Sequence, residues 1–265
     1  MTVEDDVRAI VEPRTGTFGI YARNLGTGET VGVDADRVLP TESAAKTFVL
    51  VHYSRLVDSG DCDPTRRVTY TREDHAFGSG VLRFLAPGVA LTLDDLAWLM
   101  IIVSDNAATH MLLDEVGGAD AVNATMAALG LGTARVNTDF SHADVFKGEP
   151  FGTSTPRDLA EVYTHLDDRC RTILFRQRFI DSLPRRLPQA DDSIDIGFDM
   201  PARVFNKTGN GLGTHTDSGL FETDTAAWVV AAMATDQQDF ASRPDDVAPG
   251  TFAEIGELLY ERWGT

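Results

Sequence analysis

Strand-like stretches occur near both ends of this sequence with helix-like stretches between them, and this arrangement limits the folds open to the chain. Residues 17–24 alternate apolar with small or polar side chains, and residues 30–33 return after a glycine-containing turn, which predicts a β-hairpin. Further strands are predicted over residues 202–205, 219–222 and 226–232. Because one sheet takes strands from both ends, the chain cannot be cut into independent halves, and we expect a single domain of residues 1–265.

Helical patterns fill the middle of the chain. Residues 43–57, SAAKTFVLVHYSRLV, are apolar nearly all round, as expected for a helix buried in the centre of a domain. Thr155 and Pro156 supply the cap and the first-turn residue of a later helix. The other helices are predicted over residues 93–103, 107–116, 119–129, 157–166 and 252–263.

Together these elements predict an α/β fold of the α+β kind, in which an antiparallel or mixed sheet carries the terminal helices and an all-helical lobe closes over it. The sheet lobe takes about residues 1–42 and 200–265, and the helical lobe about residues 43–199. Between residues 130 and 156 the periodicity disappears into Gly, Asn, Asp, Ser and Pro, and a long connection of this kind is usually functional. We expect the active site at the seam between the lobes, beside this loop.

Charge and composition limit the classes of molecule that the chain is expected to bind. A net charge of −18 repels nucleic acid and anionic membrane surfaces, so we expect a small-molecule substrate, no nucleic acid and no membrane. No run approaches about 18 apolar residues, and the first residues, MTVEDDVRAIV, are acidic where an export signal is basic and then apolar. The chain as written is therefore expected to be cytoplasmic, or secreted or periplasmic if a leader was removed, and monomeric by default.

No metal or other cofactor is expected. Cys62 and Cys170 share no metal-ligand spacing and are expected to be free thiols. The six histidines form no H-x-H or H-x-x-x-H pair, which disfavours zinc-dependent hydrolysis.

Three short motifs carry the chemistry. Lys46, one of three lysines in the chain, follows Ser43 by three residues, so a hydroxyl and an ammonium share one face of a helix. Ser104-Asp105-Asn106 lies in the break between two predicted helices, and Lys207-Thr208-Gly209 lies at the end of a predicted strand. The chance of finding S-x-x-K, S-D-N and K-T-G together is about one in ten thousand, so the three motifs need one explanation.

With these motifs in this order, the sequence resembles the class A serine β-lactamases and the penicillin-binding proteins. Gly78-Ser79-Gly80-Val81-Leu82 and Thr153-Ser154-Thr155-Pro156-Arg157 extend the resemblance over nearly the whole chain. It implies a serine β-lactamase-like fold and β-lactam hydrolysis through an acyl-enzyme. The alternatives are an esterase, a D-amino-acid peptidase or amidase of the penicillin-binding-protein superfamily, and a binding protein that is acylated and stalls.

Physical chemistry assigns the reacting groups. A serine hydroxyl is a weak nucleophile at neutral pH and needs a base within hydrogen-bond reach. Lys46 can be this base if burial and a second cation, for which Lys207 is the candidate, lower its pKa. We therefore hypothesise that Ser43 attacks a carbonyl, that Lys46 takes its proton and that Ser104 passes a proton to the leaving nitrogen.

The resemblance assigns the contacts around the scissile carbonyl. The backbone N–H groups of Ser43 and Asn210 would form the oxyanion hole, and Asn106 would hold a substrate amide.

The K-T-G motif would face a substrate carboxylate through Lys207 and Thr208, with Gly209 permitting a tight approach of the strand. The arginine that binds this carboxylate in the family finds no counterpart after the motif. His215 is expected either to line the pocket there or to pack beneath it.

The sequence departs from the family pattern at the residue that serves deacylation, the step that releases the product. Class A enzymes carry a glutamate on the loop, and this glutamate activates water for deacylation. Counting along the loop places it at Asp139 or Phe140, so Asp139 is our candidate base. Glu149 lies far down the loop, and Gly152 stands where an aspartate usually closes it.

Overall fold

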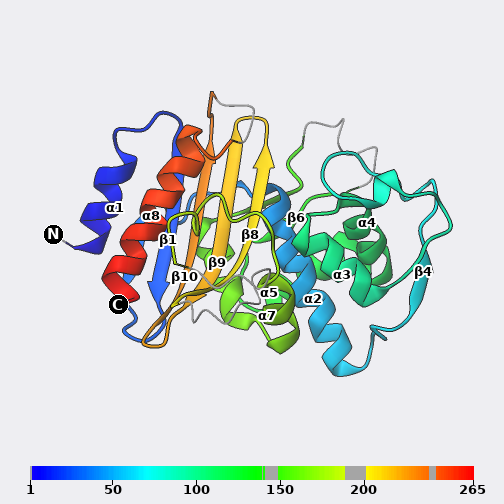
Figure 1. Cartoon of the computed structure of the whole chain (residues 1–265). Helices are drawn as coiled ribbons and strands as arrows, with labels where there is room; N and C mark the ends of the chain where they lie inside the picture. The colour runs from blue at the N-terminus through cyan, green and yellow to red at the C-terminus, as the bar shows by residue number, and fades with distance from the viewer. Residues whose placement is uncertain (1, 139, 141–148, 189–200, 239–242) are drawn as a thin grey trace.

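The computed structural model describes residues 2–138, 140, 149–188, 201–238 and 243–265. Its centre is a five-stranded antiparallel sheet in the order β2-β1-β10-β9-β8 (Figure 1). The strands are β1 (Thr17–Asn24), β2 (Thr30–Val33), β8 (Arg203–Gly211), β9 (Thr214–Glu222) and β10 (Ala227–Thr235). Strands from both ends of the chain therefore share one sheet, as the sequence predicted, and β8 lies at its edge.

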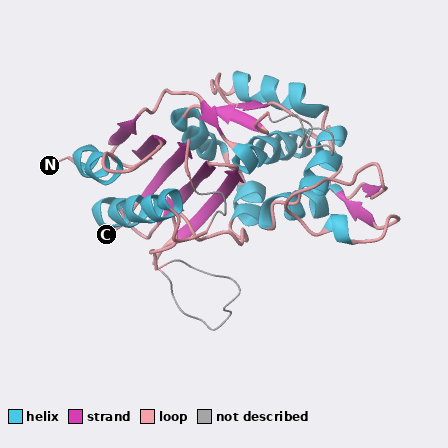
Figure 2. Cartoon of the chain, turned by 90° about the horizontal axis from the view of Figure 1, so that it is seen from above, coloured by secondary structure: helices cyan, strands magenta, loops and turns pink. Residues whose placement is uncertain are grey.

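Both faces of this sheet are covered by helices. On one face, α8 (Val247–Trp263) packs against β10 and α1 (Val3–Val11) packs against α8 and β2, and their buried residues share one core with Trp228, Val230 and Ala232 of β10. The alternate residues of β10 face the other side, where they join the core of the helical part. Figure 2 shows the terminal helices on one side of the sheet and the remaining helices on the other. Because β10 is buried on both faces, its sequence is a continuous apolar run.

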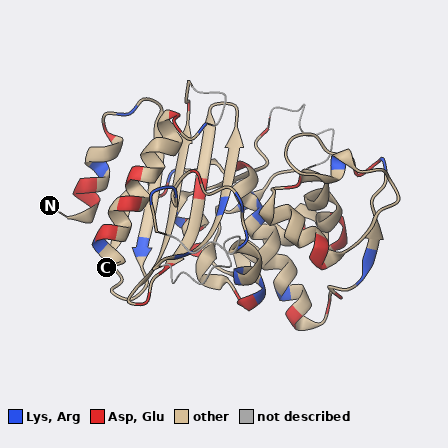
Figure 3. Cartoon of the chain, in the orientation of Figure 1, with Lys and Arg blue, Asp and Glu red and all other residues tan. Residues whose placement is uncertain are grey.

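The helical part is built around α2 (Lys46–Ser59), whose first nine residues are all buried. Around it lie α3 (Leu93–Ile102), α4 (Asn106–Glu115), α5 (Gly118–Ala128), α6 (Pro156–Glu161) and α7 (Asp168–Leu174), with short 3-10 turns at Glu42–Ala45 (η1), Leu82–Phe84 (η2) and Val162–His165 (η4). Among the described residues, no helix is long and apolar enough to cross a membrane. Acidic residues recur along α1 and α8 (Figure 3).

Two small sheets complete the fold. In one, β7 (Gly152–Ser154) pairs with both β3 (Leu39–Pro40) and β6 (Arg135–Val136). In the other, β4 (Arg67–Thr69) pairs with β5 (Ala90–Thr92). The first sheet joins the two ends of the 130–156 connection to each other and ties them to the strand that immediately precedes the turn η1.

The predicted fold class is confirmed, and each predicted helix has a counterpart, but several boundaries are wrong. The α-helix predicted from residue 43 starts at Lys46, so Ser43 lies on the 3-10 turn before it. The helix predicted over 157–166 is α-helical only to Glu161 and then tightens into η4. The C-terminal helix starts at Val247 rather than at residue 252.

The strands β8 and β9 are longer than predicted. Their polar residues between 206 and 218 lack an apolar alternation, but they pair with one another in a register that runs from Arg203 opposite Glu222 to Gly211 opposite Thr214. Lys207-Thr208-Gly209 therefore lies inside β8 and not at the end of a strand. The division into a sheet lobe and a helical lobe stays a prediction.

Candidate active site

Ser43 lies on the 3-10 turn η1, between the short strand β3 and the buried helix α2. The edge strand β8 runs directly against this turn. A Cβ atom placed on Gly209 would lie 2.2 Å from the carbonyl oxygen of Thr41 and 2.9 Å from the backbone nitrogen of Ser43. Only glycine allows so close an approach, so the backbone of the K-T-G motif and that of the nucleophile turn form one wall.

The S-D-N motif is held by its own backbone and by residues 78–82. Ser104 has a left-handed backbone with φ of 54°, which is rare for a residue other than glycine. Asp105 caps α4 through the N–H of Ala108, and its second carboxylate oxygen accepts the N–H groups of Val81 and Leu82 at 2.6 and 2.9 Å. Gly80 fits only because it has no Cβ, which would lie 2.3 Å from Cγ of Asp105.

The three motifs converge on one hydroxyl. Nζ of Lys46 lies 3.0 Å from Oγ of Ser104, and Nζ of Lys207 lies 3.2 Å from the same oxygen. Both lysine side chains have 0% exposure. The structure thus brings together two amines and a hydroxyl from α2, β8 and the α3–α4 break, as the sequence predicted.

Both amines are displaced toward their neutral forms. Burial lowers the pKa of Lys46 well below its ordinary value, and the neighbouring charge of Lys207 lowers it further. Burial also lowers the pKa of Lys207 to about 7. An amine that is neutral near pH 7 can accept a proton, which a surface lysine does not do.

In the described part of the chain, no hydrogen bond joins Ser43 to Lys46. Nζ of Lys46 instead donates to the carbonyl oxygen of Ser104 at 2.7 Å and to Oδ1 of Asn106 at 2.6 Å, besides its bond to Oγ of Ser104. The amine is therefore oriented by the S-D-N motif, and among these residues Ser43 has no hydrogen-bonded base before substrate binds.

Asn106 is held at both ends of its amide. Besides accepting from Lys46, it donates through Nδ2 to the carbonyl oxygen of Phe77 at 2.7 Å. A planar NH2 group has a second N–H, so the fixed amide can still donate to a substrate carbonyl.

Phe140, on the 130–156 loop, lies beside the amine of Lys46. Its ring is fully buried, lies 5.1 Å from Nζ of Lys46 and stacks on Phe151 with a centroid distance of 4.4 Å. Of the two positions at which the family's glutamate was expected, residue 140 thus brings an apolar ring to the amine. Asp139, our candidate base, lies outside the described residues, and Glu149 is exposed.

Steric crowding explains why Gly152 occupies the position at the end of this loop where an aspartate was expected. A Cβ atom there would lie 2.6 Å from Cβ of Ala45, from the carbonyl oxygen of Arg135 and from Oγ1 of Thr41. The loop end packs so closely on the start of α2 that no side chain fits.

The end of the K-T-G strand opens into a small cavity of about 70 Å³. Its lining includes Thr208, Asn210, His215 and Arg243. His215 is 1% exposed, and its Nδ1 lies 3.2 Å from Oδ1 of Asn210. Residues 210–218 hold no arginine, as the sequence shows, but Arg243 lines this cavity from the segment before α8.

Arg243 and Glu42 are the two residues of this region that the sequence analysis missed. Arg243 is brought to the cavity by the packing of the segment before α8, and no motif marks it. Glu42 was visible as an acid directly before Ser43, but only the structure shows that its carboxyl is directed into the protein.

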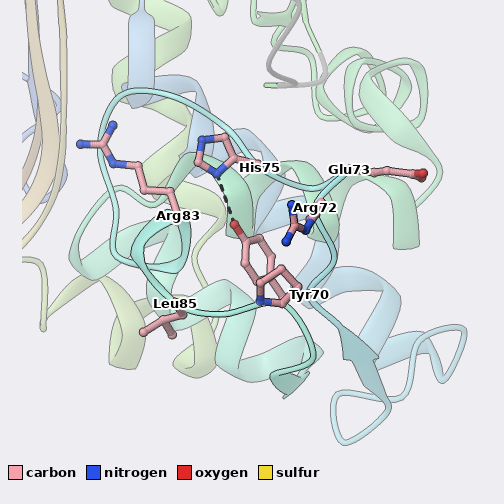
Figure 4. A pocket seen from close by; sticks show the side chains of 7 residues that line it. Tyr70, Arg72, Glu73, His75, Arg83 and Leu85 are labelled. Carbon is pink, nitrogen blue, oxygen red and sulfur yellow. Dashed lines mark hydrogen bonds between the residues drawn. The ribbon is translucent and has the colours of Figure 1, made fainter.

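A larger hollow of about 520 Å³ lies elsewhere on the helical part (Figure 4). It is lined by residues between 70 and 87, among them Tyr70 and His75, whose side chains are 3.4 Å apart. None of the predicted catalytic residues that the structure describes lines it, so its size does not make it the active site.

Comparison with known proteins places the chain among β-lactamases. The model of the β-lactamase enzyme family matches residues 2–263. A β-lactamase of Streptomyces lavendulae is 30% identical over 279 residues, which cover 97% of this chain and 85% of that protein. A crystal structure of a β-lactamase from Sphaerobacter thermophilus superposes with a TM-score of 0.82 at 29% identity, covering 98% of this chain and 96% of the other. A mutant of PBP-A, solved as an acyl-enzyme complex with penicillin G, superposes with a TM-score of 0.83 at 26% identity over 98% of this chain and 95% of the other.

Proposed function

Because the chain belongs to the β-lactamase enzyme family, we propose that it hydrolyses β-lactams through an ester formed at Ser43. Family membership makes it a serine hydrolase acting on cyclic amides. The observation that carries the proposal for the site is the placement of Oγ of Ser104 between the buried amines of Lys46 and Lys207, at 3.0 and 3.2 Å.

In the proposed acylation, Ser43 is the nucleophile and Lys46 is the base. The neutral amine of Lys46 takes the proton of Ser43 as Oγ attacks the lactam carbonyl, and a C–O bond forms. The backbone N–H groups of Ser43 and Asn210 stabilise the oxyanion, since a donor lost from such a hole typically reduces kcat by about 10²- to 10³-fold. Lys46 then passes its proton through Ser104 to the lactam nitrogen, and the C–N bond breaks.

Substrate binding uses both ends of the site. Asn106, which Lys46 and Phe77 hold in place, donates its remaining N–H to an amide carbonyl of the substrate. Thr208 and Arg243 supply a hydroxyl and a guanidinium to the substrate carboxylate in the cavity at the end of β8. The PBP-A mutant carries penicillin G as an acyl-enzyme, which supports assigning the same chemistry to this fold.

Deacylation is the slower half of the proposed cycle. The ring of Phe140 lies 5.1 Å from Nζ of Lys46, and residue 140 is one of the two positions at which the family's glutamate was expected. An apolar ring can neither hold nor deprotonate a water molecule. This observation favours a second candidate function, that of a penicillin-binding protein or peptidase in which the β-lactam adduct persists. Asp139 remains our proposed water-activating carboxylate.

Burst kinetics with a chromogenic β-lactam, followed by intact-mass spectrometry, distinguish these outcomes. A stoichiometric burst followed by sustained turnover supports the β-lactamase, whereas a burst with a lasting adduct supports the peptidase or binding protein. Turnover of simple esters without any β-lactam adduct would instead identify an esterase. Asp139→Asn should lengthen the lifetime of the adduct without slowing its formation, and equal lifetimes in the two proteins would assign the base elsewhere.

A further inference from the structure

Glu42, an ionisable residue, directly precedes the nucleophile Ser43. The proposed mechanism gives Glu42 no role. It lies on the turn η1 with a left-handed backbone, φ being 48°. This conformation is rare for a residue other than glycine. The strained backbone is therefore located at the residue directly before the nucleophile.

The carboxyl of Glu42 lies against the end of β8. A Cβ atom built on Gly211 would lie 3.0 Å from both Cδ and Oε1 of Glu42. Gly211 directly follows Asn210, whose backbone N–H is proposed to bind the oxyanion. The backbone N–H of Phe151, on the loop, donates to the same carboxyl. Glu42 thus connects the nucleophile turn, the oxyanion strand and the loop.

Among the described residues, no cation forms an ion pair with this carboxyl. The elements packed against η1 carry these ionisable residues: Lys46, His52, Tyr53, Arg55 and Asp58 on α2, Arg203 and Lys207 on β8, and His215, Asp217 and Glu222 on β9. The strand β7 carries none, and the described stretch just before it contributes the exposed Glu149. Burial raises the pKa of Glu42, and the hydrogen bond from Phe151 opposes this rise only in part.

We propose that Glu42 is a positioning residue that controls the oxyanion hole through its own protonation. As the neutral acid, Glu42 supports the end of β8 and the loop, and it does not repel the negative charge that develops on the oxygen of the scissile carbonyl. As the carboxylate it places a negative charge behind the strand that must stabilise the oxyanion, and this raises the barrier to acylation. The inference rests on the proposed function, because it concerns the acylation of Ser43.

The sign of the effect can be stated for each pH range. Below its raised pKa, Glu42 is neutral and does not itself slow acylation. As pH rises through that pKa the carboxylate forms and acylation slows. Lys46 and Lys207 also titrate, so the rate of the parent protein alone does not isolate Glu42.

The ratio of acylation rates in Glu42→Gln and in the parent isolates Glu42, since the lysines contribute equally to both proteins. Gln has the shape of the acid, accepts the Phe151 N–H and never ionises. We expect a ratio near one at low pH, where the parent is neutral. The ratio should rise to about tenfold or more at alkaline pH. Stopped-flow acylation rates with a chromogenic β-lactam between about pH 5 and pH 9 measure it.

Two further variants make the result specific. Glu12→Gln, which neutralises an exposed acid at the end of α1, should keep a ratio of one at every pH. Glu42→Leu, also neutral, should reproduce the rising ratio, and it serves as the second test should Glu42→Gln prove unstable in thermal melts.

The outcomes separate this inference from the proposed function. If the parent forms a Ser43 adduct but the ratio is the same at every pH, Glu42 is merely structural and the inference is wrong. If the parent forms no adduct at any pH, the proposed function fails, and the control by Glu42 fails with it.

Discussion

Replacing Gly209 by alanine tests whether β8 and the nucleophile turn form one wall. The added methyl carbon would lie 2.2 Å from the carbonyl oxygen of Thr41, 2.8 Å from the nitrogen of Ala44 and 2.9 Å from the nitrogen of Ser43. All three neighbours are backbone atoms, which no rotamer change can move aside. The strand and the turn must therefore separate, by about 1 Å at the closest contact, to reach ordinary van der Waals distances.

This separation affects both stability and catalysis. Overpacking a well-packed site destabilises by about 1–3 kcal/mol, which for a chain of this size corresponds to a fall in Tm on the order of 5 °C. The N–H groups of Ser43 and Asn210 lie on the two backbones that are pushed apart. A shift on the order of 1 Å in reacting groups reduces rates by about 100-fold, so we expect the acylation rate to fall by about 10²- to 10³-fold.

The assay combines thermal unfolding with the burst rate of a chromogenic β-lactam. Gly250→Ala is the matched control, because Gly250 lies within α8 and a Cβ atom there meets nothing within 4 Å. This control should stabilise the protein by about 0.5–1 kcal/mol and leave acylation unchanged. Parental Tm and burst rate in Gly209→Ala would refute the close approach of β8 to the nucleophile.

Three further predictions concern the loop, the buried acid and the cavity. Phe140→Glu should shorten the lifetime of the acyl-enzyme at least about tenfold, because a general base contributes about 10²- to 10⁴-fold; an unchanged adduct decay by intact mass would show that residue 140 does not reach the water. Burial raises the pKa of Asp217 from 3.8 to about 7. The native state then binds more protons than the unfolded chain in this range, so stability falls as pH rises from about 4 to about 7, by at most about 1.4 kcal/mol per pH unit. Asp217→Asn should flatten this fall in urea titrations, and an identical slope would contradict a native pKa near 7. Arg243→Ala should raise KM about tenfold for a β-lactam with a free carboxylate but not for its methyl ester, and equal changes for both would place the carboxylate elsewhere.

The motif residues could be predicted from the sequence because their chemistry requires a particular set of groups. A hydroxyl nucleophile needs a base. A lysine amine can be this base when burial and a second cation lower its pKa, and a buried amine also needs hydrogen-bond acceptors. The sequence therefore predicts that Lys46, Ser104 and Lys207 meet around Oγ of Ser43. The structure places the two amines 3.0 and 3.2 Å from Oγ of Ser104, while among the described residues no hydrogen bond joins them to Ser43. Their roles in the reaction remain proposals.

The remaining site features depend on contacts that no local pattern records. Residues 206–211, NKTGNG, have no strand-like alternation, yet they are strand because β9 pairs with them and the turn η1 covers them. Phe140 faces Lys46 because it stacks on Phe151, eleven positions along the chain. Arg243 reaches the cavity only through the packing of the segment before α8. Each is a tertiary effect that overrides the local sequence preference.

Peptide mapping after treatment with penicillin and an acid quench tests the central claim most directly. The account predicts one covalent adduct with the mass of the intact drug, carried by the peptide that contains Ser43, and none in Ser43→Ala. An adduct on any other residue, or turnover of the drug by Ser43→Ala at the parental rate, would contradict it.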